Sequence, residues 1–203
     1  MKDLVVLVAD KNTQFALRGA FGRPEALRIR AITHEFRPHP GRDGGARSGG
    51  VDVLARERGR FSHALLVFDL EGSGAGDDET AESLERELDA QLSLQWGTHA
   101  KAIVIVPEVD VWLWGADNAL RECLRWPLPG SIRSWLEGEG FVFGADGKLV
   151  RPKEALDKMV RIHQQPRSSA LYEKITGRIS LQRCTDAAFL RLRAALNSWF
   201  ALT

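Results

Sequence analysis

The sequence predicts an α/β fold with a mostly parallel β-sheet, helices on both of its faces and a helical carboxyl-terminal extension. Continuous apolar runs such as LVVLV at 4–8 and AIVIV at 102–106 have strand length and no polar face, which is typical of strands buried on both sides. Helical patterns separate these runs, and this alternation favours parallel strands joined by crossover helices. Residues 152–203 contain helical patterns alone.

The chain has 203 residues, 44% of them hydrophobic, which is enough for one sizeable core. We expect an α/β domain over 1–125 and a mostly helical, basic extension over 126–203 packed on it. No run approaches the roughly 18 apolar residues of a membrane span, so we expect a cytoplasmic protein with no membrane partner. Cys123 and Cys184 lack CxxC spacing and are expected to be reduced thiols.

The net charge of +1 is unevenly divided. Residues 151–203 carry ten Lys/Arg and four Asp/Glu, which leaves 18 Lys/Arg against 23 Asp/Glu in residues 1–150. An acidic part beside a basic flank suits a polyanionic substrate. A basic helical surface without a ligand is the alternative.

The first half of the chain contains two strand patterns and two helix patterns. A strand at 4–8 is followed by a helix to Phe21 that Asn12 or Thr13 can cap, and a second strand is expected over 28–36. Residues 37–50 contain five glycines and two prolines, so we expect a loop of 14 residues with a functional or mobile role. A short helix over 51–61 completes this half.

The second half begins with an apolar run at 64–69, which we take as the central strand. A glycine-rich turn follows it, and leucines at 84, 88 and 92 predict an amphipathic helix over 77–96. After the strand at 102–106, the expected elements are helices at 117–124 and 131–137, a hairpin at 140–150, and helices at 152–163, 168–176 and 186–201.

Carboxylates follow the ends of the apolar strands. Four strands carry such acids at or just past their carboxyl ends: Asp10, Glu35, Asp69 with Glu71, and Glu108 with Asp110. Because parallel strands end at one edge of a sheet, we expect these acids to gather there. Carboxylate oxygens are the ligands that Mg²⁺ prefers, so the pattern suggests metal-dependent phosphodiester chemistry. The alternatives are loop hydrogen bonds for Asp69 and Glu71, a helix cap for Asp10 and an ion pair for Glu108.

Several motifs resemble the Toprim-like (topoisomerase–primase-like) group, and more closely a family of small bacterial proteins found near phage-defence genes, including methylation-associated defence systems. The matching stretches are HPGRDG at 39–44, VFDLEGSG at 67–74, PEVDVWLW at 107–114, RPKEA at 151–155, PRSSALY at 166–172 and SLQRC at 180–184. The resemblance implies a three-layer Toprim-like sheet. It also implies a role in anti-phage defence, with other defence-system subunits as partners.

In Toprim enzymes, a glutamate after the first strand and an Asp-x-Asp after a later strand bind Mg²⁺ for strand cleavage or nucleotidyl transfer. By this resemblance, Asp69 and Glu71 occupy the second motif, and Mg²⁺ or Mn²⁺ is the implied cofactor. The first motif departs from the family pattern, because Ala9 stands where the glutamate aligns and Asp10 comes one residue late. A shifted acid that still reaches the metal and a degenerate site are both compatible with this departure.

Residues for phosphate binding and proton transfer lie outside the acid motifs. Arg167 and Ser168 open a helix and, with Lys153, provide a guanidinium, a hydroxyl and an amine for a phosphate. Arg42 and His39, from the expected loop, add a further cation and a possible proton carrier. The alternative is that Ser168 only caps a helix and Arg167 packs on the sheet domain.

Three functions are compatible with these patterns. The first is a Mg²⁺-dependent nuclease or phosphoryl-transfer protein that acts on nucleic acid or a nucleotide in anti-phage defence. The second is a non-catalytic defence subunit with a degenerate Toprim fold that binds a partner protein or nucleic acid. The third is a small-molecule phosphohydrolase. The last open question concerns four tryptophans, which either pack in the core or stack on exposed bases: Trp112, Trp114, Trp126 and Trp135.

Overall fold

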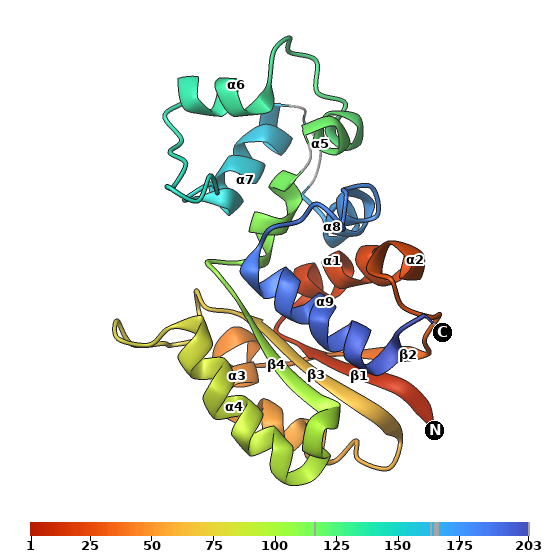
Figure 1. The fold of residues 1–203 in the computed structure, drawn as a ribbon. Helices are drawn as coiled ribbons and strands as arrows, with labels where there is room; N and C mark the ends of the chain where they lie inside the picture. The colour runs from red at the N-terminus through yellow and green to blue at the C-terminus, as the bar shows by residue number, and fades with distance from the viewer. Residues whose placement is uncertain (116, 163, 165–166, 203) are drawn as a thin grey trace.

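The computed structural model describes residues 1–115, 117–162, 164 and 167–202, and in these it shows one four-stranded sheet between two helical layers (Figure 1). The strands are β1 (Lys2–Val8), β2 (His34–Pro38), β3 (Phe61–Asp69) and β4 (Ala100–Ile105). All three strand pairs are parallel, in the order β2-β1-β3-β4. The predicted α/β fold with a parallel sheet is confirmed.

The strand order determines which face each helix covers. The chain passes from β1 to β2 through α1 (Lys11–Phe21) and α2 (Pro24–Leu27). It then changes direction, passing to β3 on the other side of β1 through α3 (Arg42–Ala55) and on to β4 through α4 (Ala81–Trp96). Because such crossovers are right-handed, reversing direction places the two pairs of helices on opposite faces. Figure 1 shows α3 and α4 on one face and α1 on the other. The reversal falls between β1 and β3, where open α/β sheets bind ligands.

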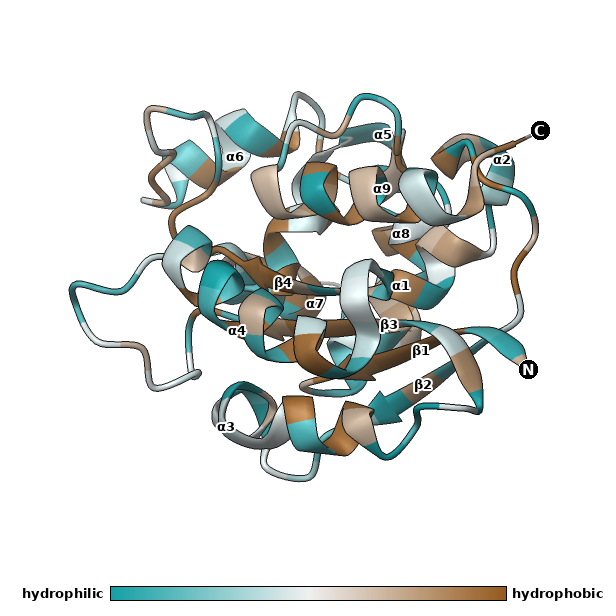
Figure 2. Cartoon of the chain, turned by 60° about the horizontal axis from the view of Figure 1, so that its bottom comes forward, coloured by the Kyte–Doolittle hydropathy of each residue, from teal (hydrophilic) through white to brown (hydrophobic). Residues whose placement is uncertain are grey.

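Both faces of the sheet are buried, which explains the continuous apolar runs. In β1, Leu4, Val6 and Val8 belong to the hydrophobic cluster on the α1 face, whereas Val5 and Leu7 belong to the cluster under α3 and α4. Successive side chains of a strand point to opposite faces, so a strand covered on both sides needs apolar residues at every position. Figure 2 shows the mostly hydrophobic strands β1, β3 and β4 between helices that carry both hydrophilic and hydrophobic residues.

The carboxyl-terminal part divides between two places in the fold. Its elements are α5 (Asp117–Leu124), α6 (Ile132–Gly138), α7 (Pro152–Ile162), α8 (Ser169–Thr176) and α9 (Ala187–Phe200). Figure 1 shows α5, α6 and α7 beyond the edge of the sheet, whereas α9 lies along its α1 face. Two short 3₁₀ helices, η1 (Gly97–His99) and η2 (Val109–Gly115), flank β4.

Helices α8 and α9 extend the core of the sheet. Leu192 and Phe200 of α9 are buried in the same cluster as Leu65 of β3. The hydroxyl of Thr176 in α8 donates to the carbonyl of Ala16 in α1 at 2.8 Å. The last helices are therefore part of the layer that covers one face of the sheet.

The expected loop at 37–50 is wrong, because β2 runs to Pro38 and α3 begins at Arg42. The glycines serve close packing against the sheet. A Cβ on Gly50 would lie 2.6 Å from Cδ1 of Leu66, so only glycine allows α3 to approach β3 so closely at this point. Tertiary packing overrides the low helix propensity of glycine here. The strand expected over 28–36 begins only at His34.

Other element boundaries also differ from expectation. Helix α4 begins at Ala81, after a capping box formed by Thr80 and Ser83. The hairpin expected over 140–150 is reduced to one antiparallel bridge between Phe143 and Leu149. His163, the expected last residue of α7, lies outside the described residues.

Both cysteines are free, with Cys123 buried and Cys184 partly buried, as expected. Among the described helices, none combines the length and the apolar character needed to cross a membrane.

Candidate functional site

An acidic cleft of about 540 Å³ lies where β1 and β3 end. Its described carboxylates are Asp10, Asp43, Asp69, Glu71, Glu108 and Asp110, and its described cations are Arg42, Lys153 and Arg167. Asp10 follows β1, Asp69 closes β3, and Glu108 and Asp110 follow β4. The structure therefore brings together five predicted acids from the ends of three strands, at the point where the sheet order reverses. Glu35 lies outside the cleft, where it pairs with Lys2 and Arg37.

Asp69 is at the centre of this group. Its Oδ1 accepts the backbone N–H of Val109 at 3.0 Å, and its own N–H donates to Oδ1 of Asp43 at 2.9 Å. Burial, followed by the negative charge of Asp43, raises the pKa of Asp69 well above its usual value, and Asp10 and Glu108 add to the rise. A carboxylate surrounded in this way by other acids favours a bound cation or a proton.

Asp10 has a dual position, because it caps α1 and also lines the cleft. Its Oδ1 accepts from the N–H of Thr13 at 2.9 Å and from the hydroxyl of Thr13 at 3.0 Å. The expected cap at Asn12 or Thr13 is thus wrong, and Asp10 is the N-cap residue. Its Oδ2 lies 3.7 Å from the guanidinium of Arg42 and is not used by the cap.

Asp43 is a site residue that the sequence reasoning missed. It belongs to the first turn of α3, and its carboxylate reaches across to the end of β3. Burial raises the pKa of Asp43, and the charge of Asp10 adds to this rise, while the hydrogen bond from the Asp69 amide opposes it. Assigning 37–50 to a loop hid this residue, although the GRDGG pattern places an acid where a helix can start.

Glu108 and Glu71 occupy the β4 side of the cleft. Glu108 is buried, and desolvation together with the neighbouring charge of Asp110 raises its pKa to about 7. Glu71 is exposed, and its N–H donates to the carbonyl of Pro107 at 3.1 Å, which ties the turn after β3 to the end of β4. Glu71 therefore presents its carboxylate at the rim, while Glu108 lies deeper.

Arg42 and Lys153 are exposed cations at the rim of the cleft. The Arg42 side chain is 76% exposed and lies 3.7 Å from Asp10, and the Lys153 side chain is 53% exposed and lies 3.7 Å from Glu108. Exposed pairs at this distance are worth about 0–1 kcal/mol, so they restrain neither cation strongly. Both are free to contact an anionic ligand, as the sequence analysis expected.

Arg167 is held more firmly than the sequence suggested. Its two terminal nitrogens contact Asp110 at 2.8 Å and Asp157 at 2.6 Å, and its guanidinium also contacts the hydroxyl of Tyr172. Tyr172 in turn donates to Asp110 at 2.7 Å. This network joins η2, α7 and α8, so Arg167 supports the wall of the cleft in addition to lining it.

Ser168 does not line the cleft in the way expected. It is exposed at the N-cap position of α8, and its side chain makes no capping hydrogen bond. Ser169 lines the cleft instead, and its hydroxyl donates to Oδ1 of Asn12 at 2.9 Å. The serine in the cleft is therefore Ser169, one residue after the predicted Ser168.

His39 lies in a hollow that adjoins the cleft and shares Asp10, Asn12 and Arg42 with it. Its Nδ1 accepts the N–H of Gly41 at 3.0 Å, so the neutral ring carries its proton on Nε2. A Cβ on Gly45 would lie 2.4 Å from this Nδ1, which means that the ring packs directly on α3. His39 is held by a strand end and a helix, rather than by the mobile loop that was expected.

In the described part of the chain, no three His, Cys, Asp or Glu side chains are grouped tightly enough to hold a metal ion as they stand. The donor set of the cleft is nevertheless made of carboxylate oxygens, which are the ligand type for Mg²⁺ and Mn²⁺. A cation would therefore require Glu71, Glu108 or Asp10 to move toward Asp69.

Comparison with family models, with curated proteins and with solved structures found no match to this chain.

Proposed function

We propose that this protein is a Mg²⁺-dependent, Toprim-like nuclease or phosphoryl-transfer protein that acts on nucleic acid or a nucleotide. The observation that carries the proposal is the acidic cleft, in which Asp10, Asp43, Asp69 and Glu108 lie together. Burial, and after it the charges of neighbouring acids, raises the pKa of Asp69 and Asp43. Mutual repulsion of this kind is relieved by a divalent cation. Clustered groups with perturbed pKa values are also typical of functional sites.

The residues of the cleft have complementary roles in this proposal. Asp69, Glu71, Asp10 and Glu108 hold Mg²⁺ or Mn²⁺, which when bound polarises a phosphate and activates water. Arg42 and Lys153 neutralise the phosphate oxygens from opposite sides of the cleft. His39 transfers a proton through Nε2.

The order of the motifs supports the Toprim-like assignment. Asp10 follows β1 and the Asp69–Glu71 pair follows β3, and these strands are neighbours in the sheet. The resemblance of the sequence motifs supports a role of the proposed activity in anti-phage defence, together with other subunits of such a system. Plaque counts on cells that express the protein with its neighbouring genes, compared with cells that carry the Asp69→Asn version, test this placement.

Labelled single- and double-stranded DNA and RNA, incubated with Mg²⁺, Mn²⁺ or EDTA, test the activity directly. We expect cleavage or phosphoryl transfer that requires the divalent ion and is lost in the Asp69→Asn/Glu71→Gln double variant. The control variant Asp52→Asn/Glu87→Gln removes the same charge from exposed positions away from the cleft and should keep the activity. Cleavage by the first double variant at the normal rate would disprove the site assignment.

A non-catalytic defence subunit is the second candidate, and two observations favour it. Ala9 replaces the family glutamate, and Arg167 is engaged by Asp110 and Asp157 instead of being free for a phosphate. The cleft would then receive a basic group of a partner protein, or the basic extension would bind nucleic acid. Salt-sensitive binding without cleavage in any metal would favour this candidate.

A further inference from the structure

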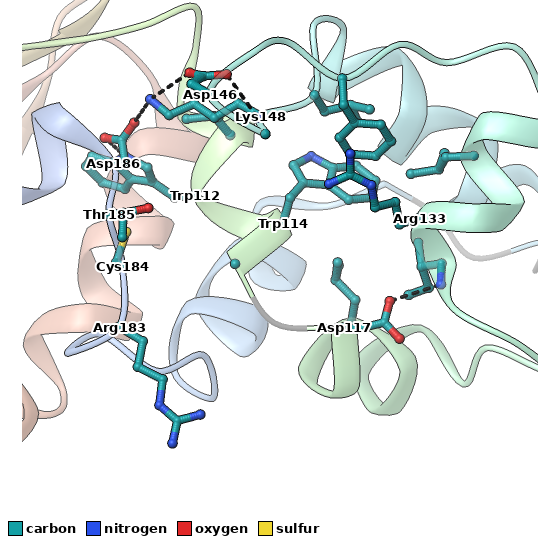
Figure 3. Close-up of a pocket in the computed structure, with 18 residues that line it drawn as sticks. Trp112, Trp114, Asp117, Arg133, Asp146, Lys148, Arg183, Cys184, Thr185 and Asp186 are labelled. Carbon is teal, nitrogen blue, oxygen red and sulfur yellow. Dashed lines mark hydrogen bonds and ion pairs between the residues drawn. The ribbon is translucent and has the colours of Figure 1, made fainter.

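A second cavity, of about 300 Å³, lies among η2, α5, α6 and the segments 143–149 and 183–186 (Figure 3). We call it the aromatic pocket, because Trp112, Trp114 and Phe143 line it. Aliphatic side chains of Leu120 and Leu136 complete its lining. It shares none of its described residues with the acidic cleft.

Trp112 forms a fixed wall of the aromatic pocket. Its Nε1 donates to Oδ1 of Asp186 at 2.8 Å, and Oδ2 of the same carboxylate accepts from Lys148 at 2.7 Å. Figure 3 shows Asp186 between these two partners. A ring held by a buried, charge-assisted network keeps its orientation when a ligand binds.

Trp114 forms an adaptable wall. Its Nε1 is buried and has no hydrogen-bond partner among the described residues. A rotation of the indole that presents this N–H to a ligand therefore breaks no hydrogen bond, and an acceptor on the ligand would satisfy a donor that is now unpaired. The pocket thus favours a ligand that has both an aromatic face and a hydrogen-bond acceptor.

The size and the rim of the pocket restrict the ligand further. A volume of 300 Å³ is at the lower end for small-molecule sites and is too small for a helix or a duplex. At the rim, the guanidinium carbon of Arg133 lies 4.2 Å from the centre of the Phe143 ring, so that a cation and an aromatic face are presented together. One planar heterocycle with an attached sugar matches this space.

The aromatic pocket and the acidic cleft are joined through two segments of chain. Val109 and Asp110 of η2 line the cleft, whereas Val111 and Trp112, the next residues, line the pocket. Lys148 and Leu149 line the pocket, and Lys153 lines the cleft a few residues later. The two cavities therefore have η2 as a common wall, and a nucleotide that reached both would contact this helix.

We infer that the aromatic pocket binds a single unstacked nucleobase, through stacking on its tryptophans and a hydrogen bond from Trp114. The choice of a base among planar heterocycles rests on the proposed function of the acidic cleft. The base comes either from a single-stranded nucleic acid or from a free nucleotide, and the two sources share the same recognition chemistry.

Calorimetric titration of the full chain with adenosine, AMP and a short single-stranded oligonucleotide tests the inference, with tryptophan fluorescence as a second readout. The blocking variant is Gly115→Leu, because Gly115 lines the pocket and a Cβ there meets open space. Its matched control is Gly138→Leu, at the end of α6, where a Cβ also meets open space outside the pocket. Trp114→Phe keeps an aromatic ring and removes the N–H donor.

We expect Gly115→Leu to weaken binding by at least about five-fold, since stacking on one aromatic residue contributes about 1–3 kcal/mol per base. Trp114→Phe should weaken it less, and Gly138→Leu should bind normally. If Gly115→Leu weakens binding of the oligonucleotide alone, the base comes from a nucleic acid. If it weakens binding of adenosine and AMP alone, the base comes from a free nucleotide. Undiminished binding by Gly115→Leu, or no binding of any of the three probes to the wild type, would overturn the inference.

The Asp69→Asn/Glu71→Gln variant separates this inference from the proposed function. We expect it to bind adenosine like the wild type, because neither residue lines the aromatic pocket. Metal-dependent cleavage without base binding would disprove base binding by the aromatic pocket and support catalysis by the acidic cleft. Base binding without cleavage would support the inference about the aromatic pocket and disprove the catalytic role of the cleft.

Discussion

Replacing Glu108 with Gln should make the protein more stable at alkaline pH and leave it almost unchanged at acid pH. Burial, together with the charge of Asp110, raises the pKa of Glu108 from 4.5 to about 7. An acid with a raised pKa in the folded state binds a proton more tightly there than in the unfolded chain. The wild type therefore loses stability as the pH rises from about 4.5 to about 7, and the loss is complete above that range.

The size of the effect follows from the same rise in pKa. One pKa unit corresponds to about 1.4 kcal/mol, so the rise from 4.5 to about 7 corresponds to about 3 kcal/mol. The side chain is only 9% exposed, so solvent screening reduces this little. The attraction of Lys153, which lowers the pKa of Glu108, is already included in the value of about 7 and is not subtracted again.

Urea unfolding followed by tryptophan fluorescence in EDTA, at pH 5, 6, 7 and 8, measures the difference in unfolding free energy. We expect Glu108→Gln to exceed the wild type by about 2–3 kcal/mol at pH 8 and by less than about 1 kcal/mol at pH 5. The exposed control Glu87→Gln should show no difference that depends on pH. A gap between Glu108→Gln and the wild type of equal size at pH 5 and pH 8 would refute the electrostatic account of the cleft.

Three further predictions concern the cleft and its support. In scanning calorimetry at pH 8, saturating Mg²⁺ should raise the melting temperature of the wild type but not that of Asp69→Asn/Glu71→Gln. At a Mg²⁺ concentration of a hundred times the dissociation constant, the gain in unfolding free energy is about 2.7 kcal/mol. Arg167→Met should lower the unfolding free energy by about 3–5 kcal/mol in urea unfolding, because it leaves the carboxylate of Asp110 buried without a cation. Adding Asp110→Asn to this variant should restore part of the lost stability. Gly50→Ala should destabilise by about 1–3 kcal/mol in the same assay, because its Cβ would lie 2.6 Å from a leucine methyl group of β3.

Matched controls separate these effects from general ones. Arg178→Met removes an arginine whose pair with Glu122 is exposed, and should change stability by less than about 1 kcal/mol. Gly138→Ala places a methyl group in open space at the end of α6, and should be neutral or stabilising. Equal losses in the control and in its test variant would contradict the packing and charge arguments above.

Local sequence was sufficient for much of the secondary structure. The apolar runs at 4–8, 64–68 and 102–105 all became strands, because a strand covered on both faces needs apolar residues at consecutive positions. Helices with a clear apolar stripe, such as α7 and α9, were also predicted to within a residue or two. Both signals lie within a short window of the chain.

Local sequence failed where long-range packing decides the structure. The glycines of α3 predict a loop, and they became a helix because close approach to the side chains of β3 favours residues without a Cβ. This error concealed Asp43, whose carboxylate reaches the end of β3 only when α3 starts at Arg42. For the same reason, the sequence predicted Ser168 in the cleft, whereas the structure has Ser169 there.

By itself, the sequence determined that acids would stand at the carboxyl ends of buried parallel strands. Only the tertiary structure decided that β1 and β3 are neighbours, that Asp10 and Asp69 therefore share one cleft, and that Asp43 joins them. The physical reason is that the composition of a strand reports how deeply it is buried. Its position in the sheet depends on crossover handedness and on contacts between residues far apart in the chain.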